Sequence, residues 1–118
     1  MSEYSKDLGV VHISHDVIAS IAAIAASEVE GVHSLSTGAR ADLRGKRNIA
    51  KGVKITIENG NVTCYLFILV KRDCPILDVS KAVQENVKSH IESMTGLHVA
   101  AVNVNVAGVA FGKTERKA

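Results

Sequence analysis

The sequence predicts an α+β fold, a two-layer α/β sandwich in which two helices pack on one face of a small, mostly antiparallel sheet. Apolar residues make up 47% of the chain and are mainly aliphatic, which suits a core of Val and Ile. Two stretches repeat apolar residues at helical spacing, and β-branched stretches around them give the order β-α-β-β-α-β. We expect residues 1–118 to form one domain, with its core at about 8–111 and short polar termini.

The first strand and the first helix are expected before residue 32. Residues 8–13 are short, apolar and β-branched, so they predict the first strand. Ser14 follows as a helix N-cap, because its hydroxyl can accept a free backbone N–H of the first turn. Gly31 is expected to end this helix. The apolar residues that recur at helical spacing are Ile18, Ile21, Ala22, Ala25 and Val29.

A basic surface loop is predicted at about residues 33–51, because the segment is rich in Ser, Thr and Gly and lacks apolar periodicity. It carries several cations against one acid, Asp42. With two aromatic residues of a later strand, these cations and Lys54 form the candidate interaction surface. Its members are Arg40, Arg44, Lys46, Arg47, Lys51, Lys54, Tyr65 and Phe67.

A β-hairpin is expected next. Apolar and polar residues alternate over residues 53–58, which is typical of a strand with one exposed face. Asn59-Gly60 then predicts a tight turn, since both residues tolerate positive φ. The return strand, residues 62–71, is apolar on nearly both faces. Such a strand is either central and covered twice or half of an interface.

The second helix and the last strand complete the order. Pro75 fits the first turn of the helix, and Gly96 is expected to end it. The last strand is predicted at residues 99–109, with a bulge near Ala100-Ala101 where the apolar parity changes. The predicted buried stripe of the helix consists of Val79, Val83, Val87, Ile91 and Met94.

No motif in the sequence predicts an enzyme, a metal site or a cofactor site. The five histidines lack the tight spacing of zinc ligands, and no phosphate-binding glycine loop or G-x-S-x-G motif occurs. Cys64 and Cys74 are expected to be reduced thiols, one of them in or near the core. The longest apolar stretch is too short to span a membrane, and no signal peptide opens the sequence. The expected location is therefore cytoplasmic.

The basic segment leaves three interpretations open. Clustered Arg and Lys can neutralise the phosphates of a nucleic acid, but only Tyr65 and Phe67 are available for base stacking, which makes nucleic acid the weaker candidate. The same charges could attract anionic lipid headgroups, so direct membrane contact without insertion stays open. A solvated loop without a partner explains the pattern equally well.

Three blocks of sequence carry a resemblance to a known family. The first is Gly9-Val10-Val11-His12-Ile13-Ser14, with Glu28-Val29-Glu30-Gly31-Val32 after the helix; the second is Lys51-Gly52-Val53-Lys54. The third is the most specific, with Val83-Gln84-Glu85-Asn86-Val87-Lys88, Met94-Thr95-Gly96-Leu97 and Val102-Asn103-Val104-Asn105-Val106. Over about residues 9–109 the chain resembles the bacterial alkaline shock protein family, also called envelope stress response or general stress proteins.

The resemblance implies a non-enzymatic intracellular protein linked to cell-envelope homeostasis and to alkaline or general stress. It brings no catalytic, metal or cofactor residues. The expected partners are further copies of the same chain and a membrane-anchored protein, so the hypothesis is a scaffold or adaptor at the cytoplasmic membrane face. The alternative from another class is a nucleic-acid-binding module that uses residues 40–54.

Overall fold

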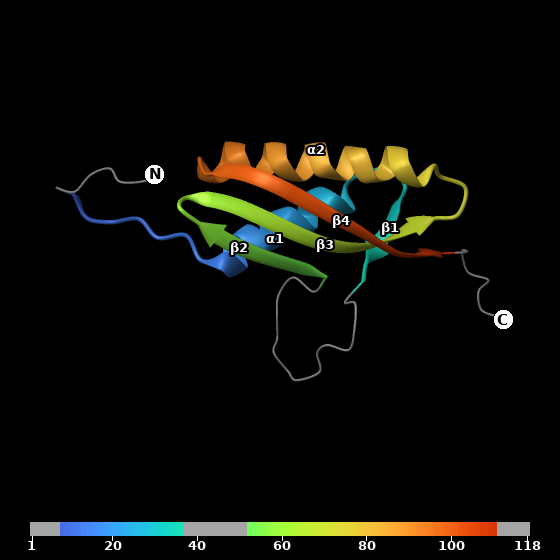
Figure 1. The fold of residues 1–118 in the computed structure, drawn as a ribbon, viewed down its shortest axis with the longest axis horizontal. Coiled ribbons are helices and arrows are strands. Elements are labelled where there is room, and N and C mark those ends of the chain that lie inside the picture. Colours follow the sequence, from blue (N-terminus) through green and yellow to red (C-terminus); the bar gives the residue numbers. More distant parts are fainter. Residues whose placement is uncertain (1–7, 37–51, 111–118) are drawn as a thin grey trace, which may run out of the picture.

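A computed structural model of the chain describes residues 8–36 and 52–110. Two helices and four strands form two layers (Figure 1). In chain order the elements are α1 (His15–Ser27), β1 (Val32–Leu35), β2 (Val53–Glu58), β3 (Asn61–Lys71), α2 (Ile76–Thr95) and β4 (His98–Ala110). The predicted α+β class is therefore confirmed, with both helices on one side of the sheet.

The central strand of the sheet is β3. The hairpin strand β2 pairs antiparallel with its first half, and β1 pairs antiparallel with its second half, so β1 and β2 lie end to end along one edge. Along the other edge β4 runs parallel to β3 over its whole length. Two of the three pairings are antiparallel, as the mostly antiparallel prediction required.

The core lies between the sheet and the helices. Every second residue of β3 points toward the helices and is fully buried, from Val62 to Val70. Above them, α1 contributes small residues and α2 contributes its predicted apolar stripe, both of which pack into one cluster. All core residues in the described part of the chain are apolar. Burial of this aliphatic surface holds the two layers together.

Local signals form the element ends as predicted. The Ser14 hydroxyl accepts a hydrogen bond from the Val17 N–H at 3.2 Å, which caps α1. Asn59 and Gly60 have φ of 55° and 78°, the positive values that a tight hairpin turn needs. Gly96 ends α2 in the left-handed conformation. The register of β4 skips Ala100, which confirms the predicted bulge.

The first strand was predicted in the wrong place. Residues 8–13 are not a strand, because nothing in the described chain pairs with them, and α1 is the first element. The strand that pairs there is β1, which overlaps the start of the segment predicted as a loop at about residues 33–51. Its Val32 and Leu35 pair with Val70 and Ile68 and cover an otherwise open edge of β3. The order is therefore α-β-β-β-α-β.

Two smaller predictions also need correction. The helix α1 ends at Ser27 with Glu28 as its C-cap, so Gly31 is not the helix stop. Met94 is 65% exposed and leaves the buried stripe. The stripe advances four residues at a time, so the position after Ile91 is Thr95, which is half-buried. The predicted basic loop falls largely on residues 37–51, outside the described residues.

Candidate interaction surface

The sheet face opposite the helices carries three large apolar residues in a row. Tyr65, Phe67 and Leu69 alternate with the buried residues of β3, so they point away from the helices. They are partly exposed, and the residues that pack against the core come from the other face. In Figure 1, α1 passes behind the strands, and no described element crosses in front of them. The sheet face that carries Tyr65, Phe67 and Leu69 is called the open face.

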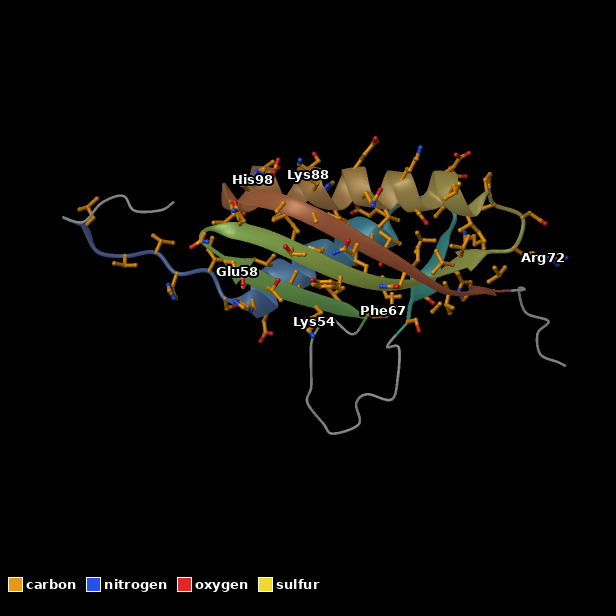
Figure 2. The ribbon with its side chains drawn as sticks, viewed as in Figure 1. Lys54, Glu58, Phe67, Arg72, Lys88 and His98 are labelled. Carbon is orange, nitrogen blue, oxygen red and sulfur yellow. The ribbon has the colours of Figure 1, made fainter. Side chains whose placement is uncertain are left out.

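Polar side chains surround the apolar row. Lys54 on β2 is the register partner of Tyr65, and it is exposed. On the other side, Asn103 and Asn105 of β4 pair with Tyr65 and Phe67 and are also exposed. Lys54 and Phe67 thus lie on neighbouring strands of one surface (Figure 2). An apolar centre with a polar rim is the usual composition of a protein–protein interface.

Phe67 is also where the chain leaves and rejoins the sheet. The Ser36 N–H donates to the Phe67 carbonyl at 2.7 Å, and the Phe67 N–H donates to the Gly52 carbonyl at 2.9 Å. Gly52 has φ of 85°, and a Cβ there would clash with the Ser36 carbonyl oxygen. Ser36 and Gly52 are therefore both held beside Phe67, and only a glycine fits at position 52.

The structure brings part of the predicted surface together. Lys54, Tyr65 and Phe67 share the open face, as just described. The five remaining basic residues, Arg40, Arg44, Lys46, Arg47 and Lys51, lie outside the described residues. The sequence placed Leu69 on the same strand face as Tyr65 and Phe67, but the predicted surface did not include Leu69 or its neighbour Asn105. The alternation of β3 gave the parity of Leu69, but only the parallel pairing with β4 shows which residues flank it.

Polar contacts in the helix layer tie the elements to one another. Asn86 of α2 donates from Nδ2 to the Ala25 carbonyl of α1 at 2.7 Å. His90 lies 3.8 Å from the Glu28 carboxylate, and both side chains are well exposed. Such an exposed pair contributes little to stability. These contacts orient the two helices and leave the open face untouched.

The two cysteines of the chain differ in their burial. Burial raises the pKa of the Cys64 thiol to about 12, so this sulfur stays protonated and unreactive at neutral pH. Cys74 is half-buried, and both thiols are free. Within residues 8–36 and 52–110, no group of three His, Cys, Asp or Glu side chains is placed to hold a metal ion. Among the described helices, none is long and apolar enough to cross a membrane.

Together these features define a small α+β domain with one helix-covered sheet face and one open face. Solved structures share this fold. A MamM CTD variant aligns with a TM-score of 0.51 and 14% sequence identity, over 80% of this chain and 99% of that one. The copper form of another MamM CTD variant aligns with a TM-score of 0.51 and 10% identity, over 80% and 98% of the two chains. At this identity the likeness concerns the fold alone.

The chain belongs to the alkaline shock protein 23 family, which has a cell envelope-related function, and it matches that family over residues 3–111. The uncharacterized protein Spy1535 of Streptococcus pyogenes is 36% identical over 110 residues, 92% of this chain and 85% of that protein. The uncharacterized protein YqhY of Bacillus subtilis is 35% identical over 115 residues, covering 94% and 84% of the two chains. The resemblance to the alkaline shock protein family is thereby confirmed.

Proposed function

We propose that this protein is a non-enzymatic scaffold or adaptor of the bacterial cell envelope, which acts under stress through self-association and protein contacts at the cytoplasmic membrane face. Membership of a family with a cell envelope-related function supports the setting. The open face is the observation that carries the mechanism. Tyr65, Phe67 and Leu69 present apolar surface that no described element covers, and burial of such surface drives association.

The composition of the open face supports a protein partner. Its aromatic centre is flanked by Lys54 and by the side-chain amides of Asn103 and Asn105, which can donate and accept hydrogen bonds. Aromatic residues in the centre of an interface usually provide most of its binding energy. A non-enzymatic role agrees with Cys64, whose buried thiol carries a raised pKa but faces the core instead of a cleft.

The proposal is tested with a substitution on the open face. Phe67→Ser is expected to weaken self-association and capture of membrane proteins at least tenfold, because it removes the central aromatic side chain. The measurements are light scattering of the purified protein and affinity capture from the native cell with the membrane fraction retained. Ile24→Ser is the matched control, since Ile24 is 59% exposed on α1, away from the open face. A strictly monomeric protein without a membrane-associated partner would contradict the proposal.

A nucleic-acid-binding module remains the second candidate, favoured by Tyr65 and Phe67 beside Lys54 on an open sheet face. Binding of single-stranded RNA that weakens steeply with salt would support it. The triple variant Arg44→Ala, Lys46→Ala, Arg47→Ala should then reduce binding further. Sedimentation with anionic liposomes, done with the same variant, separates lipid binding from RNA binding. No change of RNA affinity with salt would exclude this candidate.

A further inference from the structure

The segment that precedes α1 is strongly apolar, yet most of it is exposed and only Ile13, at its end, packs against the core. Leu8, Val10 and Val11 are 91%, 88% and 77% exposed. Between residues 8 and 13, no backbone group makes a hydrogen bond to another described residue. β-branched residues favour a strand, and exposed apolar neighbours are costly in water. Residues 8–13, called the donor segment, therefore have the properties of a strand without a sheet.

The free edge of β4, the edge away from β3, has the complementary property, because no strand in the described residues pairs with it. β4 spans 13 residues and contains no Lys, Arg, Asp, Glu or Pro. Proteins usually protect such edges with charges, proline or a covering element. The opposite edge follows that rule, since β1 has only four residues and β2 carries the exposed charges of Lys54 and Glu58. The edge of β4 is open to strand addition.

Contacts with α2 show which backbone groups face this edge. The Val99 N–H donates to Glu92 Oε2, and the Val102 carbonyl accepts from Gln84 Nε2, both at 3.0 Å. These two side chains occupy the first part of the edge. Backbone groups of a strand alternate between its two edges, so Val104 and Val106 point the same way as Val102. For residues 103–110, no described side chain bonds to the backbone in this way.

We infer that the donor segment of one copy adds as a strand to residues 103–110 of β4 in a second copy. This inference deepens the proposed self-association and rests on it. Every copy carries one unpaired apolar segment and one uncharged sheet edge, and pairing between them would satisfy the free backbone groups of both. Adjacent side chains of a strand point to opposite faces, so the added strand would bring one of Val10 and Val11 to the helix side of the sheet and the other beside the open face.

The geometry explains why the strand comes from another copy. The donor segment precedes α1, which packs against β1 and β2, on the edge of the sheet away from β4. In Figure 1 the segment runs away from the domain at the hairpin end of β2. Ile13, at its end, packs against the core and fixes this exit. The segment thus lies at the sheet edge formed by β1 and β2, whereas β4 of the same chain forms the opposite edge.

Two variants separate the donor from the acceptor. Val10→Pro with Val11→Pro removes adjacent N–H donors, so the segment cannot pair through either of its edges, and both side chains are exposed enough to leave the fold intact. Val106→Pro removes one N–H on the free edge of β4, where proline is tolerated. Sedimentation velocity should show each variant as a monomer at concentrations where the unchanged protein is associated. A mixture of the two should form a one-to-one dimer, because each supplies the half that the other lacks.

Any other result of these sedimentation experiments would overturn the inference. If the Val10→Pro, Val11→Pro variant associates like the unchanged protein, β4 edges pair with one another or the open face dominates, and the proposed self-association still stands. If the unchanged protein is monomeric but captures a membrane protein, an adaptor role stands without strand addition. Val10→Thr with Val11→Thr is the matched control, since it retains the N–H groups and should keep association.

A second acceptor variant covers the case in which Val106→Pro does not fold, as judged by circular dichroism. Asn103→Lys with Asn105→Lys changes two exposed side chains and places charges beside the free edge, which disfavours strand addition. It should also be monomeric alone and pair with the Val10→Pro, Val11→Pro variant. Because Asn103 and Asn105 also flank the open face, this pairing is the decisive readout: a lysine variant that had lost association through the open face would not pair in the mixture. Persistent self-association of this lysine variant, with its fold intact, would overturn the inference.

Discussion

Cys64 shows how a single buried group makes stability depend on pH. Its side chain has no exposed surface and lies among the apolar residues on the helix side of β3. A thiolate there would lose its hydration without gaining a partner, so the pKa rises from 9.0 to about 12. The folded chain therefore keeps the thiol proton at alkaline pH values where the unfolded chain releases it.

This difference in proton binding predicts a loss of stability in alkali. Because the folded pKa lies above the unfolded one, the contribution is fully present below pH 9 and is lost as the pH rises toward 12. The free energy of unfolding should fall by about 1.4 kcal/mol per pH unit in this window through Cys64 alone. Urea unfolding at pH 8 and pH 10 measures it, with Cys64→Ala as the variant that lacks the effect.

The gap in stability between the unchanged protein and Cys64→Ala should therefore narrow as the pH rises. Val62→Ala is the matched control, since Val62 is equally buried on the same strand face and does not titrate. The difference in free energy of unfolding between the wild-type protein and Val62→Ala should be the same at both pH values. A gap for Cys64→Ala that also stays constant would show that the thiol pKa is not raised in the folded protein.

Individual residues were predictable where one local rule decides their role. The Ser14 cap, the Asn59-Gly60 turn and the Gly96 helix end each depend on a few neighbouring residues, and all three are confirmed. Met94 was not predictable in this way. Its apolar character suggested burial, but its angular position on α2 decides its exposure.

At the level of elements, local pattern predicted most of the segments and misplaced one strand. Residues 8–13 and residues 32–35 are both short, but residues 8–13 contain three β-branched residues and residues 32–35 contain only Val32. What distinguishes them is access to the second half of β3, which β1 reaches directly after α1 and which residues 8–13 do not reach. Pairing between distant segments is a property of the whole fold, so the sequence pattern alone could not choose between them.

The connection between α1 and β1 depends on Gly31, which has φ of 102°. A Cβ at this position would lie 2.5 Å from Cγ2 of Val79 on α2. Gly31→Ala should therefore lower the free energy of unfolding by about 2–4 kcal/mol, through backbone strain and the steric clash together. Thermal or urea unfolding measures this change.

Two controls separate the strain from the clash. Gly96→Ala places a Cβ at φ of 81° with no atom within 4 Å, so it should cost only the strain, about 1–2 kcal/mol. Adding Val79→Ala to Gly31→Ala removes the clashing methyl group. Val79→Ala should therefore lower the free energy of unfolding less in the Gly31→Ala variant than in the wild-type protein. If Gly31→Ala costs no more than Gly96→Ala, the contact with Val79 is not tight.

At the scale of the whole molecule, the candidate surface was predictable only in part. The two-sided apolar pattern of β3 predicted either a covered strand or an interface, and Tyr65 and Phe67 do lie on an open face. The pairing of β3 with β4 and the return of the chain at Phe67 join segments far apart in sequence. No local pattern encodes those neighbours.

Strand addition would also determine the shape of the assembly. The donor segment and the β4 edge are different surfaces on opposite sides of the sheet, so their contact is head-to-tail and need not close into a ring. We therefore expect the mean mass in sedimentation equilibrium to rise continuously with protein concentration. A Val10→Pro, Val11→Pro chain keeps its β4 edge but cannot extend further, so small amounts of it should shorten the assemblies. The Val10→Thr, Val11→Thr chain should not shorten them. A mass that stops rising at the dimer would instead indicate two copies that exchange donor segments reciprocally, and open-ended growth would be excluded.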